Sequence, residues 1–322
     1  MKFTIGFEKE DTRKFHECVD DIIASQRWTE AKYTKLFEEK WSAHCGLPTV
    51  AFSSWGGAAL AALEYFDLGR KTVLCPSNTF MATPFSVIKA GGRVEFVDCN
   101  TTDLCLSFDN LKRKIDEFKP AAVWVVHIGG HIAFEIEKIA ALCREKGIVL
   151  LEDCAHAHGA SWNGRKAGAW GDAGVYSFYA TKTITTGEGG TLVTRNQALI
   201  EYAQKYRNYG KFDYAVPGLN YRMSEFTAAL GGIQVDRLDE IVDWKNDFAR
   251  RVLDPRFPNR LKFPEGMESG YYKYIVFDEI PNSTGKVYDL PCHKIMKKGY
   301  DLPNSDWVAG HHWCVPLYYK GE

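Results

Sequence analysis

The chain has 322 residues, of which 45% are hydrophobic and 14% aromatic, so it is long enough for one large and one smaller domain with buried cores. Its 40 basic and 41 acidic residues give a net charge of −1, which excludes recruitment of nucleic acid or of an anionic membrane by a global field. The amino terminus lacks a signal-peptide pattern and no apolar run reaches the length of a membrane span, so we expect a cytoplasmic protein. Nine cysteines without a CxxC pair predict reduced, mostly structural thiols.

Residues 10–46 are predicted to form covering helices, because apolar residues recur there three and four positions apart. The stretch TVAFSSWGGAALAALEYF then predicts a short strand, a turn and an Ala-rich helix. Gly56, Gly57 and Ala58 stand at the start of that helix, where unpaired backbone amides and the helix dipole favour an anion such as phosphate. A plain helix start is the alternative interpretation.

Strand-like runs alternate with helical segments over residues 71–151, and this alternation is typical of an α/β protein with a mainly parallel sheet. Phe80 follows the first of these runs in a polar loop. His127 and His131 bracket the sequence IGG after a later run. No cysteine or carboxylate cluster at ligand spacing accompanies them, so we predict no metal site and expect His131 to face a substrate.

The stretch 147–195 carries the residues on which the prediction of function depends. Residues 148–151 form an apolar run of strand length that ends in acids, and ligands of α/β proteins bind outside such strand ends, where Asp153 stands. A second strand at 174–178 leads to Lys182 in a loop rich in Thr and Gly. A desolvated lysine can form a Schiff base with an aldehyde cofactor, whose pyridinium nitrogen then needs a carboxylate partner. The alternative is that Lys182, like most lysines, is a solvated surface charge.

From residue 226 the pattern changes to a long amphipathic helix and then to the strand-like YYKYIVFDEI. We therefore expect a large domain over residues 1–225 and a smaller α/β domain over residues 226–322. The carboxyl end is rich in His, Trp and Tyr. There His311 or His312 could bind a sugar or could be packing residues, and the sequence leaves both readings open.

Three stretches in order, EDCAHAHGA, GDAGVYSFYATKTITTGEGG and GLNYRMSEFTAALG, resemble the DegT/DnrJ/EryC1/StrS family of PLP-dependent sugar aminotransferases. The resemblance implies the aspartate aminotransferase-like transferase fold, fold type I, with a small domain that is abbreviated in this chain. It implies pyridoxal 5'-phosphate held by Lys182 as an internal aldimine, with Asp153 against the ring nitrogen.

The resemblance also assigns roles to individual residues. It places Phe80 against the cofactor ring and Ser177 on the phosphate. His156 stands beside the phenolic oxygen, where the family typically has glutamine, so its charge would depend on pH. Gly57 stands where the family usually has a threonine that contacts the phosphate. Asn220 matches a residue that reaches across a homodimer interface to the phosphate of the partner's cofactor.

The activity implied is a ping-pong transamination from an amino donor, by family analogy L-glutamate, to a nucleotide-linked ketosugar in amino-sugar, surface polysaccharide or natural-product biosynthesis. Arg222 could bind a carboxylate or phosphate of a ligand, or could pair with Glu225. Two alternatives stay open: an aminotransferase acting on a non-nucleotide keto-sugar, cyclitol or aldehyde, and a non-catalytic PLP-binding regulatory protein. An NAD site is a weaker reading, because no GxGxxG follows a first strand.

Overall fold

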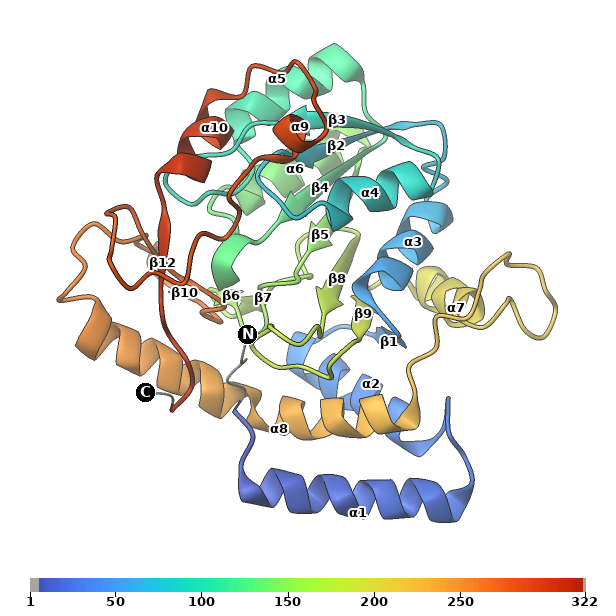
Figure 1. The fold of residues 1–322 in the computed structure, drawn as a ribbon. Helices are drawn as coiled ribbons and strands as arrows, with labels where there is room; N and C mark the ends of the chain where they lie inside the picture. Colours follow the sequence, from blue (N-terminus) through green and yellow to red (C-terminus); the bar gives the residue numbers. More distant parts are fainter. Residues whose placement is uncertain (1–5, 321–322) are drawn as a thin grey trace.

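The centre of the molecule is a seven-stranded sheet (Figure 1) in a computed structural model that describes residues 6–320. The strands lie in the order β1-β9-β8-β5-β4-β2-β3. All neighbours pair in parallel except the two pairs that contain β9, which runs opposite to β8 and β1. This confirms the mainly parallel sheet of an α/β protein. The strands are Thr49–Phe52 (β1), Thr72–Pro76 (β2), Arg93–Val97 (β3), Ala122–Val126 (β4), Val149–Asp153 (β5), Ala173–Ser177 (β8) and Gly190–Val193 (β9).

Both faces of the sheet are buried, which is why its strands are continuous apolar runs rather than alternating ones. In β4, for example, Val123 and Val125 belong to one hydrophobic cluster, whereas Ala122 and Trp124 belong to the cluster on the opposite face. Helices α3, α4 and α7 contribute to the second cluster, and α2, α5, α6 and α8 contribute to the first. The predicted covering helices at 10–46 are present as α1 and α2. The helices up to the end of the sheet are Lys9–Ser25 (α1), Lys32–Cys45 (α2), Trp55–Tyr65 (α3), Ala82–Lys89 (α4), Phe108–Phe118 (α5), Ile136–Lys146 (α6) and Gln197–Tyr206 (α7).

The carboxyl-terminal part begins with the 24-residue helix Glu225–Phe248 (α8), which lies beside α1 (Figure 1) and continues as a π-helical turn at Ala249–Leu253. The remaining short elements include Ser161–Trp162 (β6), Arg165–Lys166 (β7), Met267–Glu268 (β10), Tyr274–Val276 (β11), Cys292–Ile295 (α9), Pro303–Gly310 (α10) and Trp313–Val315 (β12). Their strands form two small sheets, and one of these pairs β10 of this part with β6, which with β7 comes earlier in the chain.

Residues 226–320 have a small core of their own but also pack onto the large sheet. Leu253, Tyr274 and Val315 belong to a separate hydrophobic cluster. Val308 of α10, in contrast, belongs to the cluster of the central sheet. Figure 1 shows α9 and α10 returning to the end of the molecule where α5, β2 and β3 lie. The division at residue 225 therefore stays a prediction.

The cysteines are packing residues rather than a disulfide framework. All nine are free thiols, eight of them buried and Cys18 half-buried. Within the described range 6–320, none of the helices combines the length and the apolar character that crossing a bilayer requires.

Candidate active site

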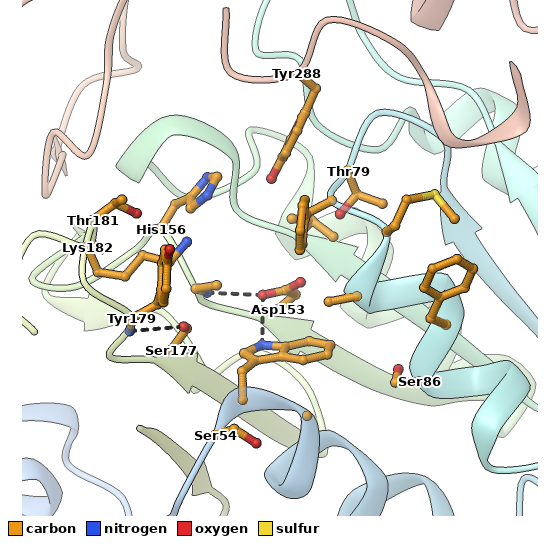
Figure 2. Close-up of a pocket in the computed structure, with 18 of the residues that line it drawn as sticks. Ser54, Thr79, Ser86, Asp153, His156, Ser177, Tyr179, Thr181, Lys182 and Tyr288 are labelled. Atoms are coloured by element: carbon orange, nitrogen blue, oxygen red, sulfur yellow. Dashed lines mark hydrogen bonds between the residues drawn. The ribbon is translucent and has the colours of Figure 1, made fainter. Parts of the chain in front are cut away.

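A cavity of about 990 Å³ opens at the carboxyl ends of the central strands (Figure 2). Asp153 is the last residue of β5, and Ser177 is the last residue of β8. Because β5 and β8 are parallel neighbours, their ends meet at one edge of the sheet and both side chains line the same cavity. Its volume lies at the upper end of the range of roughly 300–1000 Å³ that is typical of small-molecule sites.

Six residues predicted from the sequence line this cavity from four different segments of the chain: Gly56, Phe80, Asp153, His156, Ser177 and Lys182. Seven other predicted residues, all within the described part of the chain, lie outside its lining: Gly57, Ala58, His131, Asn220, Arg222, His311 and His312.

The Asp153 carboxylate is held by three donors. Oδ1 accepts hydrogen bonds from Trp55 Nε1 at 3.1 Å and from the Ala155 amide at 3.1 Å, and Oδ2 accepts one from Thr83 Oγ1 at 2.8 Å. Burial raises the pKa of Asp153, while the bond from Thr83 and the charge of Lys182 lower it. The carboxylate is thus fixed in orientation at the floor of the cavity.

The residue before it, Glu152, is fully buried and anchors this edge of the sheet. Its carboxylate pairs with His127 Nε2 at 2.9 Å and accepts the amides of Gly168 at 2.8 Å and Trp170 at 2.6 Å. His127 Nδ1 accepts the Ala133 amide at 3.1 Å, so Nε2 carries the proton donated to Glu152. This network fixes the strand end on which the cavity carboxylate stands.

Lys182 lies in the loop after β8 and projects into the cavity (Figure 2). Burial lowers the pKa of its amine from 10.5 to about 8; the Asp153 carboxylate opposes this effect and Lys273 adds to it. Its Nζ lies 4.8 Å from the centre of the Tyr272 ring, whose hydroxyl shares a 3.1 Å hydrogen bond with the Thr181 hydroxyl. Lys182 is therefore a desolvated amine in a site, not a surface charge.

The start of α3 corrects the expectation for two of its amides. Ser54 caps the helix, and the Gly57 amide donates to Ser54 Oγ at 3.2 Å while the Ala58 amide donates to the Ser54 carbonyl at 3.4 Å. Of the three residues predicted to bind phosphate at this helix start, only Gly56 lines the cavity. A side chain at Gly57 would put its Cβ 2.9 Å from the Tyr221 ring, which explains why a threonine does not fit at this position.

Phe80 and Ser177 both line the cavity. Phe80 is 65% exposed, so its ring is free to stack on a ligand. Ser177 Oγ accepts the Tyr179 amide at 3.3 Å (Figure 2). Both positions are compatible with the contacts predicted for them.

His156 lines the cavity but is not poised to titrate near neutral pH. Its Nδ1 accepts the Gly129 amide at 3.3 Å, and its ring stacks on Tyr272 at a centroid distance of 4.1 Å. Burial, and then the charge of Lys182, lower the pKa of His156 well below its usual value. The expected pH-dependent charge is corrected: the imidazole is neutral at pH 7.

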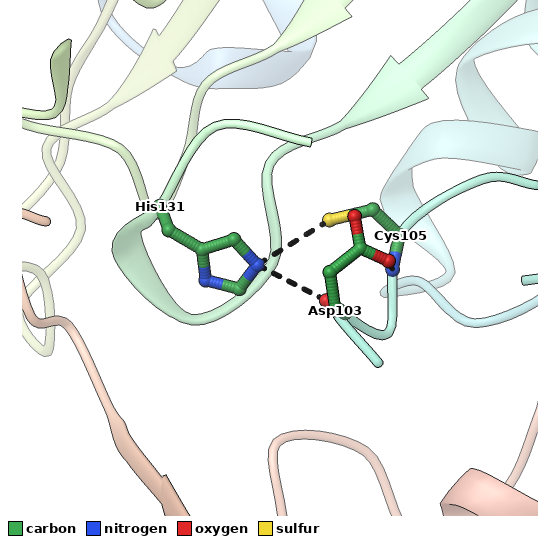
Figure 3. A group of neighbouring side chains, drawn as sticks. All are labelled: Asp103, Cys105 and His131. Atoms are coloured by element: carbon green, nitrogen blue, oxygen red, sulfur yellow. Dashed lines mark hydrogen bonds between the residues drawn. The ribbon is translucent and has the colours of Figure 1, made fainter. Parts of the chain in front are cut away.

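His131 is corrected as a substrate residue, because it lies in a closed cluster with Asp103 and Cys105 (Figure 3). It is 1% exposed, and its Nε2 bonds to the Asp103 carbonyl at 3.0 Å. The Asp103 carboxylate accepts the amides of Cys105 at 3.0 Å and Phe134 at 2.8 Å. These groups satisfy one another and fix the loop after β4.

Asn220 and Arg222 lie on the loop before α8, and Asn220 is exposed. Arg222 Nη1 donates to Asn208 Oδ1 at 2.6 Å, and its guanidinium lies 5.7 Å from the centre of the Tyr209 ring. Arg222 therefore does not pair with Glu225, whose carboxylate instead caps the start of α2. The role of Asn220 across an interface stays a prediction.

The two carboxyl-terminal histidines differ sharply. His311 is exposed and stacks on Trp307 at 4.8 Å, whereas His312 is fully buried. His312 bonds to the Val308 carbonyl through Nδ1 and accepts the Val287 amide on Nε2 at 2.9 Å. Neither residue lines the cavity, so of the two readings left open by the sequence the structure favours packing for the buried His312.

The lining residues that the sequence did not single out include Trp55, Tyr272 and Tyr288. The tyrosines come from the carboxyl-terminal part, where aromatic residues are too common to single out any one. A signal did exist for Tyr272 in the glycine pair of IGG. A Cβ at Gly130 would lie 2.6 Å from the Tyr272 amide, so the glycine permits this segment to approach the sheet.

Comparison with protein-family profiles matches residues 9–257 to the DegT/DnrJ/EryC1/StrS aminotransferase family. The chain belongs to this family. Members of the DegT/DnrJ/EryC1/StrS family are PLP-dependent aminotransferases, and the fold type I expectation is confirmed by solved structures. The aminotransferase TlmJ from Streptoalloteichus hindustanus has a TM-score of 0.89 and 27% identity, over 99% of this chain and 93% of that one.

Two curated relatives in the DegT/DnrJ/EryC1/StrS family bear on the substrate. The GDP-perosamine synthase of Vibrio cholerae is 33% identical over 245 residues, which cover 74% of this chain and 65% of that protein. The L-glutamine:scyllo-inosose aminotransferase of Streptomyces griseus is 30% identical over 293 residues, covering 81% of this chain and 68% of that protein. The chain thus spans about two thirds of the length of these relatives.

The donor set of the cavity fits the cofactor of the DegT/DnrJ/EryC1/StrS family. A buried carboxylate, a desolvated amine and an exposed phenylalanine ring line one space, as a charged pyridine aldehyde requires. The phosphate end is less complete within one chain, because only Gly56 and Ser177 of the predicted phosphate contacts line the cavity.

Proposed function

We propose that the protein is a PLP-dependent aminotransferase that moves an amino group from L-glutamate to a nucleotide-linked ketosugar. The observation that carries the proposal is the pairing of Lys182 and Asp153 in one cavity, with the amine pKa lowered to about 8 by burial. At pH 7 such an amine has a usable neutral fraction, which an ordinary lysine lacks. A nucleotide-linked acceptor is supported by similarity to the GDP-perosamine synthase.

In this proposal, pyridoxal phosphate supplies an electron-withdrawing ring that stabilises negative charge on the carbon next to the amine. Asp153 would accept the hydrogen bond of the ring nitrogen, and its three donors keep it aimed at the cavity. Lys182 would hold the cofactor, and its Nζ would then take the proton from the α-carbon of the donor and deliver it to the C4′ carbon of the cofactor. Phe80 would cover one face of the ring.

We further propose a homodimer in which Asn220 of one subunit completes the phosphate site of the other. The loop that carries Asn220 exposes large apolar side chains, with Phe212 91%, Tyr214 69% and Leu219 56% exposed. Exposed apolar groups so close together favour burial against a partner. Mixing Lys182→Ala and Asn220→Ala subunits should restore activity, because one site of the mixed dimer is intact. No recovery after subunit exchange would contradict a shared site.

The transferase proposal is tested by absorption spectroscopy and product analysis. The wild-type protein with pyridoxal phosphate should show a visible band that glutamate removes, and should then aminate a member of a panel of GDP- and dTDP-linked ketosugars. Lys182→Ala should lose the band. Lys245→Met is the matched control, since Lys245 is another buried lysine with a pKa lowered to about 8 but lies outside the cavity lining. A visible absorption band of the wild-type protein that no amino donor removes would contradict the aminotransferase proposal.

A cyclitol acceptor is the second candidate, and similarity to the L-glutamine:scyllo-inosose aminotransferase favours it. Adding scyllo-inosose to the panel, and L-glutamine beside L-glutamate, separates the two. Amination of scyllo-inosose alone would replace the nucleotide-sugar assignment.

A further inference from the structure

One wall of the cavity is made by a short segment from the far end of the chain, residues 287–290, called here the 287–290 strap. All four of its residues line the cavity. Tyr288 reaches from this strap toward the side where His156 lies (Figure 2). The two rings are nearly parallel, at 20°, with centroids 6.0 Å apart. An aromatic side chain with a hydroxyl therefore lies in the cavity opposite the sheet.

The strap is fixed at both of its ends. At its start, the Val287 amide donates to His312 Nε2 at 2.9 Å. After its end, the Cys292 amide donates to the Ser77 carbonyl at 2.8 Å, and the His293 amide donates to Ser77 Oγ at 3.2 Å. The second attachment joins the strap to Ser77, the residue that follows β2. The position of the strap relative to the sheet is therefore fixed by hydrogen bonds to a strand end of the buried core.

Both ring nitrogens of His312 are engaged in hydrogen bonds, one of which is the first attachment of the strap. His312 is fully buried, and its Nδ1–H faces the Val308 carbonyl while Nε2 accepts from Val287. Only the neutral Nδ1–H tautomer makes both bonds. The charged groups near it are Lys286, whose Nζ donates to the His312 carbonyl at 3.1 Å, and Asp289 on the strap.

We propose that Tyr288 binds the sugar or cyclitol ring of the amino acceptor, and that His312 is the positioning residue that holds it there; this inference rests on the proposed function. A polyhydroxylated ring presents C–H faces that pack on an aromatic ring and hydroxyls that bond to a phenol. The tyrosine combines both, and it enters the cavity from the strap with its hydroxyl end directed toward the strand end that holds Asp153 (Figure 2).

The test measures the two half-reactions separately in the full-length holoenzyme. Tyr288→Leu should raise the KM for the acceptor that wild type aminates best by about tenfold, the combined loss of ring stacking and one hydrogen bond, with kcat changed little. Tyr288→Phe should raise it by roughly threefold, since only the hydrogen bond is lost. The rate of the glutamate half-reaction and the absorption band should not change in either variant.

His312→Phe keeps a ring but cannot accept the Val287 amide, so it should also raise the acceptor KM. Its effect should disappear when Tyr288 is already Leu, because His312 acts only through that tyrosine. His311→Ala is the matched control, and should leave the KM within twofold of wild type, since the exposed His311 ring bonds to and stacks on Trp307 and His311 does not line the cavity. If His312→Phe does not fold, His312→Asn keeps an N–H donor near the Nδ1 position for the Val308 carbonyl, but its shorter side chain has no acceptor at the Nε2 position that the Val287 amide uses.

Several outcomes overturn the inference. An unchanged acceptor KM in Tyr288→Leu refutes the contact, and an effect of His312→Phe that adds fully to that of Tyr288→Leu refutes the positioning role. A lost glutamate half-reaction in Tyr288→Leu would show that the residue serves the cofactor instead. If wild type aminates no acceptor, the inference falls with the proposed function, whereas an active wild type with an indifferent Tyr288 removes only the inference.

Discussion

Replacing Lys182 by methionine should stabilise the cofactor-free protein at neutral pH, although it should abolish activity. Burial lowers the pKa of the amine from 10.5 to about 8. Each pKa unit corresponds to about 1.4 kcal/mol, so the protonated amine destabilises the fold by at most about 3 kcal/mol. The side chain keeps some exposure to solvent, and we therefore expect a gain of about 2 kcal/mol in Lys182→Met.

The sign of the pH dependence follows from the direction of the shift. Below pH 8 the amine is protonated in both the folded and unfolded chains, and the full penalty is present. Between pH 8 and 10.5 the folded protein releases its proton first, so the penalty shrinks. The advantage of Lys182→Met should therefore be largest at pH 7 and less than half as large at pH 10.

Urea unfolding of protein purified without cofactor measures this difference directly. With an unfolding entropy of about 2.1 cal/mol/K per residue, 2 kcal/mol also corresponds to a rise in Tm of roughly 3 °C. Lys112→Met, at an exposed position of α5, is the control and should change stability by less than about 0.5 kcal/mol. Equal or lower stability of Lys182→Met at pH 7, or a gain that does not fall at pH 10, would refute the reasoning.

Three further substitutions test the supports of the cavity. Gly57→Ala puts a Cβ 2.9 Å from the Tyr221 ring and should lower the free energy of unfolding by about 1–3 kcal/mol. Gly56→Ala is the control, because its Cβ would meet one atom at 3.8 Å, and it should leave the free energy of unfolding unchanged. Equal effects of the two substitutions in denaturant titrations would contradict this. Glu152→Gln replaces a buried carboxylate, which only accepts hydrogen bonds, by an amide that also donates, and should lower the free energy of unfolding by about 3 kcal/mol. A thermal midpoint equal to that of wild type would argue against the anchoring role of Glu152. Trp55→Phe removes an N–H donor from the carboxylate that ends β5. Trp55→Phe should lower the free energy of unfolding by roughly 1.5–3 kcal/mol at pH 7. The loss should be clearly smaller well below pH 3.8, because burial raises the pKa of Asp153 and its carboxyl group is protonated there. Unfolding curves that show the same loss at both pH values would contradict the hydrogen bond from Trp55 to the Asp153 carboxylate.

The elements that could be predicted from the sequence are those with a local physical signal. The apolar run before Asp153 has the length and ending of a buried strand, and β5 ends at that residue. The periodicity of 10–46 predicts α1 and α2 for the same reason. A lysine in a small, hydroxylic loop after a strand likewise needs no distant contact to be recognised, and Lys182 does line the cavity.

The predictions that failed depended on the geometry of a helix start or on contacts between distant segments. The amides of Gly57 and Ala58 are already used because Ser54 caps the helix, and a cap geometry is not fixed by composition. His131 was expected to face a substrate because it follows a strand, but the loop that carries Asp103 covers it. Tyr288 is about 135 residues from Asp153 in sequence and enters the cavity only because the chain returns to the sheet.

The most direct test of the central claim is to reduce the protein with borohydride in the presence of pyridoxal phosphate and to map the modified residue by peptide mass. The account predicts one stoichiometric label, on Lys182, and far slower labelling of Lys273 and Lys245. A label spread over several lysines, or absent from Lys182, would contradict the claim that this amine holds the cofactor.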